Sequence, residues 1–245
     1  MGAEKDAWKG RTRLMLGDER LVALEAAHVM VVGLGGVGSA CAAALVRGGV
    51  GNLTVVDADV VEESNINRQV IAFPSTVGRD KAEVTAALAR AINPEVHVRA
   101  RRQLVLPEAV EALLGEDAPD FVVDCQDTVA TKLALARVCE QRGVPLTSAM
   151  GAGNRFDPTR LAFADIYDTS VCPLCRVVRK RARAAGVRRL RVLYSTEPLP
   201  DSAVAANARA TKEEHPVIGT MSYLPPIMGQ MLAADCICTL CGIEW

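Results

Sequence analysis

The chain has 245 residues, half of them apolar, and 28 basic residues against 29 acidic ones give a net charge of −1. This length and composition suffice for one large α/β domain with a real core, and they exclude a polycation or an acidic tail protein, so any nucleic-acid role must rest on a local patch. Aromatic residues make up only 4%, so Ala, Val and Leu must fill the core, which suits a parallel sheet covered by helices.

From residue 28 to residue 150 the pattern alternates between strands and helices. Short apolar runs predict strands at His28–Val32, Asn52–Asp57, Val96–Ala100, Phe121–Cys125 and Val144–Ala149. Helices are predicted between them at Gly36–Arg47, Asp80–Ile92, Pro107–Leu114 and Thr128–Arg142. Repeated β-α units imply right-handed crossovers, so the sequence predicts an α/β fold with a doubly wound, mostly parallel, Rossmann-like sheet.

The pattern changes after Gly151. Strands are predicted at Leu161–Ile166 and Leu190–Tyr194, and helices at Pro173–Ala185 and Leu224–Leu240. The small, polar segment 200–215 is expected to be mobile. We therefore divide the chain into an N-terminal helical segment (1–27), a nucleotide-binding core (28–150) and a substrate-binding elaboration of the same domain (151–245).

The first 20 residues are mixed and charged, without the apolar stretch of a secretion signal. This favours the cytoplasm, where cysteines are thiols or metal ligands rather than disulfides. Residues 217–243 carry a single charge, Asp235, but Pro225-Pro226 interrupts the stretch and Gln230 would lie at hydrocarbon depth. A buried helix is favoured over a membrane span, and no membrane partner is expected.

The hexapeptide GLGGVG follows the first strand and opens a helix, which is the context of a nucleotide-binding loop. Gly33 permits the tight turn, Gly35 and Gly36 let the backbone approach phosphate or ribose, and Gly38 allows close packing of helix on sheet. Asp57 ends the next strand, where an acid can hold ribose hydroxyls. The alternative, a glycine turn without a ligand, is less consistent with strand, helix and acid together.

The loop alone does not distinguish NAD from ATP, but the following block does. Attack on an α-phosphate needs concentrated positive charge, which hydride transfer does not, and Arg68 and Lys81 supply it. Asn65 can orient an oxygen. Asp127 follows the strand that starts at Phe121 and is a candidate Mg²⁺ ligand beside phosphates, although it could equally cap the next helix. The sequence therefore indicates ATP and Mg²⁺.

The runs GLGGVGS, DADVVEESNINRQ and DCQDT, together with Lys81, resemble the ubiquitin-activating-enzyme-like adenylating superfamily, which contains the ThiF and MoeB proteins. The resemblance implies that Arg68, Lys81 and Asp127 contact ATP or its metal, and we expect the same of Asp59 and Gln69. It also implies a homodimer in which an N-terminal arginine reaches the phosphates of the neighbouring subunit. Arg11 is the best match for that arginine, and Arg13 is a poorer one.

A narrower resemblance covers nearly the whole chain. Residues 148–160 (SAMGAGNRFDPTR), 164–174 (ADIYDTSVCPL) and 192–197 (VLYSTE) are similar to the tRNA threonylcarbamoyladenosine dehydratases. That family implies ATP-dependent ring closure on adenosine 37 of tRNA: the carboxylate of the threonylcarbamoyl group attacks the α-phosphorus, and the carbamoyl group then displaces AMP. The nucleophile of the second step is tethered, so proximity lowers its barrier.

The alternative is an adenylyltransferase that activates the C-terminal glycine of a ubiquitin-like sulfur carrier. Relatives of that kind often place a cysteine before the closing helix, but residues 176–235 contain none, which argues against thioester transfer there. Carrier adenylation alone, and docking of a sulfur-transfer protein, stay open.

Two C-x-x-C pairs, Cys172–Cys175 and Cys238–Cys241, could complete a tetrahedral zinc site. They could also be small apolar residues at i, i+3 on buried helix faces. The sequence leaves both interpretations open. The other four cysteines are most simply buried.

Between residues 176 and 191 every charged residue is basic. A solvated helix face normally mixes signs, so this stretch predicts contact with tRNA phosphates rather than with bases. The expected contact residues are Arg176, Arg179, Lys180, Arg183, Arg188 and Arg189.

Overall fold

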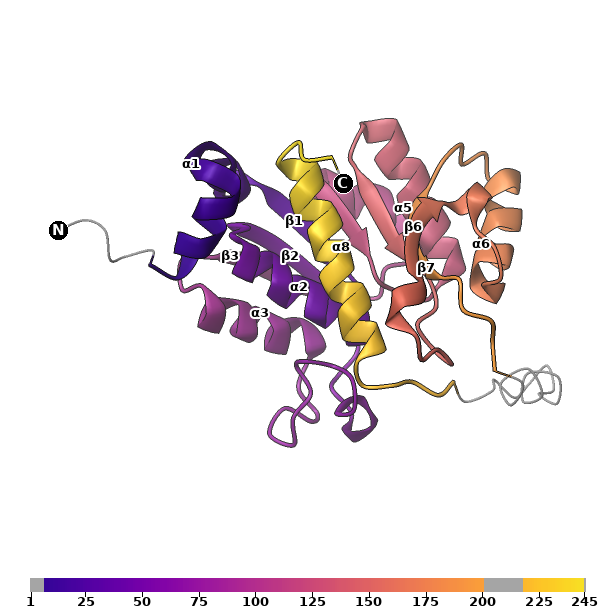
Figure 1. Ribbon diagram of the computed structural model, residues 1–245, viewed down its shortest axis with the longest axis horizontal. Coiled ribbons are helices and arrows are strands. Elements are labelled where there is room, and N and C mark those ends of the chain that lie inside the picture. Colours follow the sequence, from indigo (N-terminus) through magenta and orange to yellow (C-terminus); the bar gives the residue numbers. More distant parts are fainter. Residues whose placement is uncertain (1–6, 201–217, 245) are drawn as a thin grey trace.

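A single seven-stranded sheet forms the centre of the computed structural model, which describes residues 7–200 and 218–244 (Figure 1). Its strand order is β3-β2-β1-β4-β5-β7-β6. The strands are β1 (His28–Val32), β2 (Asn52–Asp57), β3 (His97–Arg102), β4 (Phe121–Asp124), β5 (Leu146–Ala149), β6 (Leu161–Asp165) and β7 (Arg191–Ser195). All neighbouring pairs are parallel except β6 with β7 at one edge. The predicted mostly parallel, doubly wound α/β fold is confirmed.

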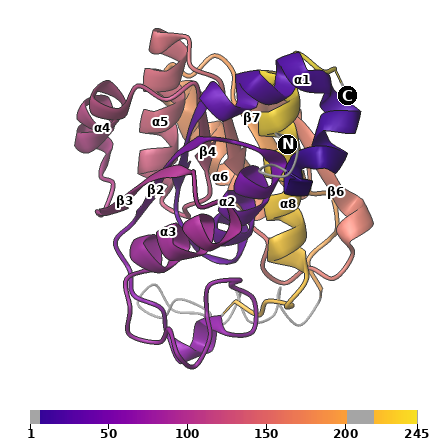
Figure 2. The same ribbon diagram turned by 90° about the vertical axis from the view of Figure 1, so that its left-hand side faces the viewer.

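Helices cover both faces of the sheet (Figures 1 and 2). On one face lie α2 (Gly36–Gly48), α3 (Lys81–Ile92) and α8 (Leu224–Leu240), whose apolar residues join one core cluster with β1 and β2. On the other face α4 (Val110–Asp117), α5 (Val129–Arg142) and α6 (Pro173–Ala184) form two further clusters. Val, Leu and Ala dominate these clusters, as the scarcity of aromatic residues required.

The strand order reverses between β1 and β4, and this reversal determines where the site lies. Chain order runs outward from β1 through β2 to β3, and then resumes from β4 on the other side. The crossover connections therefore leave in opposite directions from the carboxyl ends of β1 and β4. Ligands of open α/β sheets bind in the crevice at such a point.

The second half of the chain extends the same sheet. β7 pairs with β5 and β6 pairs with β7, and α8 crosses back to pack on α2 near the start of the chain. Asp235 of α8 is buried and receives hydrogen bonds from Thr147 at 2.6 Å and from Arg191 at 2.7 Å. Residues from both halves of the chain thus share one core.

Most predicted boundaries lie within one residue of the observed ones, and three differences have a clear physical reason. β3 runs on to Arg102 because its pairing with β2 continues to Asp57. The helix predicted from Pro107 begins as a 3-10 turn, Pro107–Ala109, before α4. β5 begins only at Leu146, because the Val144 N–H donates to Cys139 at the end of α5 and Pro145 has no N–H to donate. The segment 200–215 lies outside the described residues except for Pro200.

The remaining helical elements are α1 and several short 3-10 turns. α1 (Gly10–Ala26) follows a 3-10 turn at Ala7–Lys9 and is kinked at Gly17, where φ is +78°. Further 3-10 turns lie at Glu63–Asn65 (η2), Pro158–Arg160 (η4) and Ile166–Asp168 (η5).

α8 is a buried helix. Leu224, Met228 and Leu232 are fully buried against the core, which confirms the interpretation of this apolar stretch as a core element. Across residues 7–200 and 218–244, the structure has no helix with the length and apolar character needed to span a bilayer.

Gly229 of α8 approaches α2 so closely that a Cβ atom there would lie 2.3 Å from the Val37 carbonyl oxygen and 2.8 Å from the Cys41 nitrogen. Ala normally stabilises a helix interior by up to about 1 kcal/mol over Gly. Here backbone atoms of α2 block the methyl group, so we predict that Gly229→Ala lowers the free energy of unfolding by about 1–3 kcal/mol in urea titrations.

The matched control is Gly115→Ala in α4. A Cβ atom at that position would meet only the end of the flexible Arg142 side chain, at 3.3 Å, so stability should stay level or rise. Equal stability of the two variants would contradict the close-packing argument.

Candidate active site

The glycine loop is held where β1 ends and α2 begins by a contact that excludes side chains. Gly33 has φ +90°, and a Cβ atom there would lie 2.7 Å from the Gln126 nitrogen. At Gly38 a Cβ atom would lie 1.8 Å from the Gly33 carbonyl oxygen. Both glycines are therefore required by the fold itself. Gly35 has open space in front of it, with Gln69 the nearest group at 3.9 Å.

Gly36 makes a packing contact that the sequence did not indicate. A Cβ atom there would lie 2.8 Å from Pro225 of α8 and 3.2 Å from the Arg68 carbonyl oxygen. Gly36 does not line the cavity beside the loop. It brings the first turn of α8 and the Arg68 backbone against the start of α2.

Asp57 links the glycine loop to the end of β2 by a hydrogen bond. Its carboxylate accepts the Leu34 N–H at 2.6 Å through Oδ2 and the Asp59 N–H at 2.8 Å through Oδ1. Each oxygen thus has one backbone donor and keeps lone-pair capacity on the cavity side. The same residue holds the loop in shape and presents a negative charge beside it.

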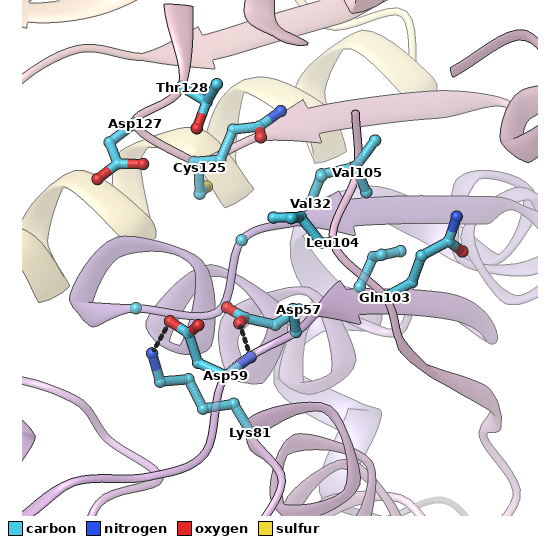
Figure 3. A pocket seen from close by; sticks show the side chains of 15 residues that line it. Val32, Asp57, Asp59, Lys81, Gln103, Leu104, Val105, Cys125, Asp127 and Thr128 are labelled. Carbon is cyan, nitrogen blue, oxygen red and sulfur yellow. Dashed lines mark hydrogen bonds and ion pairs between the residues drawn. The ribbon is translucent and has the colours of Figure 1, made fainter. Parts of the chain in front are cut away.

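A cavity of about 290 Å³ opens at the carboxyl ends of β1, β2 and β4. Of the predicted nucleotide-binding residues, the structure brings Gly33, Gly35, Asp57, Asp59, Lys81 and Asp127 together around it. Figure 3 shows Asp127 and the Asp59–Lys81 pair on opposite sides of its opening. The spacing in sequence, up to 94 residues between Gly33 and Asp127 by their numbering, is closed by the sheet.

Lys81 is pre-positioned by Asp59. Its Nζ lies 2.8 Å from Asp59 Oδ2, and its backbone N–H donates to the Asp59 carbonyl oxygen. The Lys81 side chain is only 9% exposed, whereas that of Asp59 is 69% exposed. The ammonium group is therefore held at the cavity wall by a carboxylate that water can readily solvate.

Arg68 and Asn65 belong to a tight turn beside the glycine loop. Asn65 accepts the Glu62 N–H through its amide oxygen, and its carbonyl oxygen accepts the N–H groups of Arg68 and Gln69. The Arg68 guanidinium donates to Ser64 and Asn67 and does not line the cavity. The structure thus gives Asn65 a structural use, and it places Arg68 next to the loop rather than inside the cavity.

Gln126 and Gln69 contribute buried polar atoms without partners. Within the described residues, Gln126 Nε2 and Gln69 Oε1 make no hydrogen bond. Gln126 lines the cavity and the Gln69 side chain is the group nearest to Gly35. Unpaired buried polar groups are costly, so both are suited to a polar ligand at the loop.

Asp127 stands at the start of α5 without capping it. Thr128 occupies the N-cap position and makes no side-chain cap. In the part of the chain that the structure describes, the Asp127 carboxylate forms no hydrogen bond or ion pair, and the residue is exposed at the cavity. The capping alternative is therefore wrong for the observed geometry.

The sequence reasoning missed the apolar and amide lining of the cavity. Gln103, Leu104 and Val105 follow β3, and Leu104 is 66% exposed at the rim. Val32 and Val56 complete the apolar wall. No spacing signal marks residues 103–105, since they reach the cavity only because β3 pairs with β2.

A buried charged network lies directly behind the cavity. Lys132 of α5 is fully buried and donates to Asp124 at 2.9 Å, Ser148 at 3.1 Å and the Ala149 carbonyl oxygen at 2.9 Å. Ser148 also donates to Asp124. All three ammonium protons have acceptors, so the network ties the ends of β4 and β5 to α5 just before the chain enters residues 125–128.

Arg11 lies far from the cavity of its own chain. α1 packs at the amino ends of the strands, where the Gly51 N–H donates to Leu24 and Asn52 donates to the end of the helix. Lys9 pairs with Glu25 at 2.6 Å, which keeps the start of α1 at the same end of the sheet. Any contact of Arg11 with a nucleotide in this site must therefore come from another copy of the chain.

The basic residues 176–191 separate into engaged and free side chains. Arg179 donates to Thr169, Arg188 pairs with Glu140, and Arg183 lies over the Tyr167 ring. The other three predicted contact residues, Arg176, Lys180 and Arg189, are exposed, and in the described structure their side chains have no hydrogen-bond or ion-pair partners. Half of the six predicted contact residues thus have partners within the protein.

The four C-x-x-C cysteines do not form a metal centre. Cys172 and Cys175 begin α6 on one face of the sheet, and Cys238 and Cys241 end α8 on the other. Within the residues described, no group of three or more His, Cys, Asp or Glu side chains is arranged to hold a metal ion. The buried-helix alternative therefore accounts for their spacing.

The fold and this cavity define the class of protein. The chain belongs to the ThiF family, whose profile matches residues 10–244. More particularly, it is 41% identical over 188 residues to the tRNA threonylcarbamoyladenosine dehydratase of Bacillus subtilis (strain 168), covering 76% of this chain and 74% of that protein. It is 38% identical over 182 residues to the enzyme of the same name from Escherichia coli (strain K12), covering 73% and 68%.

A solved structure extends the similarity over the whole fold. The E. coli tRNA N6-threonylcarbamoyladenosine dehydratase TcdA in complex with ATP superposes with a TM-score of 0.85 at 31% identity, covering 97% of this chain and 96% of that one. The family resemblance predicted from the motifs is confirmed, and so is the class of ATP-dependent enzyme.

The network behind the cavity generates a stability prediction. Lys132→Met removes the cation from a buried carboxylate, so we expect the free energy of unfolding to fall by about 3–5 kcal/mol, measured in urea. Adding Asp124→Asn to the same chain removes the stranded charge and should recover part of the loss. Arg137→Met, an exposed position on the same helix, is the control, and a similar loss there would contradict the prediction.

Proposed function

We propose that this protein uses ATP to close the ring of threonylcarbamoyladenosine at position 37 of tRNA, by adenylating the carboxylate of that nucleoside. The observation that carries the proposal is the cavity, in which a glycine loop, an acid after β2 and opposed charges at Lys81 and Asp127 converge. Support also comes from a relative, similar over nearly its whole length, that is solved with ATP.

The cavity suits a nucleotide in one orientation. The apolar wall of Val32, Val56 and Leu104 offers a surface for the adenine ring, and Asp57 can accept hydrogen bonds from the ribose hydroxyls. The phosphates then lie along the glycine loop at the start of α2, where backbone N–H groups and the helix dipole favour negative charge.

Lys81 and Arg68 are the proposed sources of positive charge at the reacting phosphorus. Lys81 already lines the cavity. Arg68 must exchange its hydrogen bonds to Ser64 and Asn67 for phosphate oxygens, at a cost of about 1 kcal/mol for each bond, and a charged bidentate contact can offset this cost. The cations stabilise the charge that grows as pyrophosphate leaves.

Asp127 fits a magnesium ion only together with the nucleotide. It is a free, exposed carboxylate at the cavity, and Mg²⁺ typically takes one or two carboxylates plus phosphate oxygens. The ion would neutralise phosphate charge there, with Asp127 as its protein ligand.

The proposed reaction balances as the loss of one water. A carboxylate oxygen of the substrate bonds to the α-phosphorus and the bond to pyrophosphate breaks, which leaves an acyl-adenylate. The carbamoyl group of the same nucleoside then bonds to the acyl carbon, and AMP departs with the former carboxylate oxygen. The second step is intramolecular, so its rate benefits from proximity and it needs no covalent enzyme intermediate.

A homodimer completes the proposed site. Leu14 and Met15 on α1 are 87% and 84% exposed. They lie three and four residues after Arg11 and before the kink at Gly17, so the three side chains share one face of this helix segment. In an isologous dimer each copy offers this face to the other, and Arg11 then reaches the partner's cavity. Docking of a sulfur-transfer protein stays a prediction from family resemblance, with no residue of the described structure to support it.

The central experiment is a product assay. The protein is incubated with ATP and tRNA carrying threonylcarbamoyladenosine, the tRNA is digested under mild conditions, and mass spectrometry should find the nucleoside lighter by one water. Absence of that product would remove the dehydratase proposal, and ATP–pyrophosphate exchange driven instead by a sulfur-carrier protein would favour the carrier alternative.

We predict that Lys81→Ala and Arg68→Ala each lower turnover in this assay by about 100-fold or more, because each removes a cation from the transition state. Arg79→Ala is the control, since Arg79 is exposed nearby and does not line the cavity. Unchanged turnover in both site variants would end the adenylation proposal.

Mixing two inactive variants tests the action of Arg11 in trans. Arg11→Ala and Lys81→Ala protomers, unfolded together and refolded in equal amounts, should regain about a quarter of wild-type turnover, because half of the dimers are mixed and each has one intact site. No recovery, with mixed dimers verified by differential tags, would contradict a shared site.

The tRNA surface is proposed to run along the free side chains of α6. Arg176→Glu with Lys180→Glu should weaken tRNA binding and lower the slope of log K against log salt by about 1 for each phosphate that the variant no longer neutralises. Arg47→Glu on α2, an exposed position on the other face, should have little effect. Identical salt slopes in all three proteins would contradict this surface.

A further inference from the structure

Cys172 and Cys175 sit at the start of α6 in a geometry that the nucleotide chemistry does not use. Cys172 is the N-cap residue, with φ −68° and ψ 121°, and Pro173 begins the helix. Cys175 lies in the first turn and is fully buried, and Cys172 is 5% exposed. The pair therefore spans a helix N-terminus, where backbone N–H groups lack partners within the helix.

The start of α6 favours a thiolate at Cys172. Interactions with the Cys175 thiol and with the backbone of Cys175 and Leu174, together with the positive charge of Arg155, outweigh burial and lower the pKa of Cys172 to about 6. The pKa of Cys175 is raised by its interaction with Cys172 and by burial.

Arg155 supplies an independent observation. It is 3% exposed, and in the described residues its Nε and Nη1 atoms make no hydrogen bond. A buried, unpaired guanidinium is costly unless a negative group compensates it. The Cys172 sulfur, which the Arg155 charge reaches, is such a group when it is a thiolate.

The backbone next to Cys172 is strained. Val171 has φ +60°, a left-handed conformation that is unfavourable for a β-branched side chain. Strain of this kind persists where the surrounding structure holds a functional group in place. Here it lies directly before Cys172, the N-cap residue of α6.

The second C-x-x-C pair of the chain has the same spacing but lies at the C-terminus of a helix rather than at an N-terminus. Cys238 and Cys241 lie at the end of α8, where the helix dipole presents its negative end. Burial raises the pKa of both thiols. Equal spacing at opposite helix ends thus yields one activated pair and one inert pair.

We propose that Cys172 and Cys175 form a redox-active dithiol, in which a hydroperoxide oxidises Cys172 and Cys175 closes the disulfide. In the first step the Cys172 thiolate bonds to one peroxide oxygen and the O–O bond breaks, giving Cys172 sulfenic acid and hydroxide. In the second step the Cys175 sulfur bonds to the Cys172 sulfur and water leaves. Two thiols and one hydrogen peroxide become one disulfide and two waters.

The low exposure of Cys172 selects a small oxidant, which is why the proposal names hydrogen peroxide rather than a bulky disulfide. The charged and titratable groups that face the pair are Arg155, from the loop between β5 and β6, and Arg179 of α6, whose charge acts on Cys175. Oxidation removes the negative charge opposite Arg155 at the carboxyl edge of the sheet.

The test compares the two pairs within one protein. Reduced protein is exposed to limiting hydrogen peroxide at pH 7, quenched with iodoacetamide under denaturing conditions, and digested. Mass spectrometry should find a peptide pair linked through Cys172 and Cys175, formed at least about 10-fold faster than any oxidation of Cys238, although Cys238 is the more exposed. Equal or slower oxidation of Cys172 would overturn the proposal.

Two variants separate the roles of the residues. With Cys175→Ala the sulfenic acid at Cys172 has no resolving thiol and should be trapped by dimedone, whereas a disulfide to another cysteine would contradict the assigned pair. Arg155→Met should slow Cys172 oxidation at pH 7 several-fold and move its pH profile upward, and Arg155→Lys should restore both. An unchanged profile in Arg155→Met would overturn the role of the buried cation.

Discussion

The contact between Gly33 and Gly38 is the constraint on which the rest of the site depends. A side chain at Gly38 would lie 1.8 Å from the Gly33 carbonyl oxygen, so the end of β1 and the start of α2 can approach this closely only if both residues are glycine. Their approach sets the start of α2 beside the glycine loop that lines the cavity and brings the Leu34 N–H within 2.6 Å of Asp57. An acid, a loop and a helix N-terminus are thereby fixed relative to one another before any ligand binds.

The same geometry explains how opposite charges coexist in one cavity. Lys81 is compensated by Asp59, and Asp127 has no cation of its own in the described structure. A nucleotide and its metal would supply the missing negative and positive partners. The protein therefore holds the Lys81 ammonium and the Asp127 carboxylate on opposite sides of the cavity opening. A bound nucleotide would lie between them and interact with both.

The sequence predicted the fold well because its signals are local. Strand runs such as Asn52–Asp57, the glycine loop and helix ends such as Gly143 are read within a few residues of one another. The cavity lining was predicted less completely, since Gln103, Leu104 and Gln126 arrive through pairing between distant strands. Lys132 looks like an ordinary surface lysine in sequence, and its burial follows only from the approach of β4, β5 and α5. In the basic stretch 176–191 the local pattern predicted free side chains. Arg179 and Arg188 instead have partners on other segments, which that pattern could not reveal.

The position of Gly36 bears on how members of this family can exchange parts. Pro225 of α8 would collide with any side chain at Gly36, and Gly229 one turn later approaches the α2 backbone still more closely. The closing helix is thus shaped to a loop that lies almost two hundred residues earlier. A chimaera that joined the first half of one relative to the second half of another near residue 150 would have to match this contact between α2 and α8, so the two halves are coupled even though their sequence patterns differ.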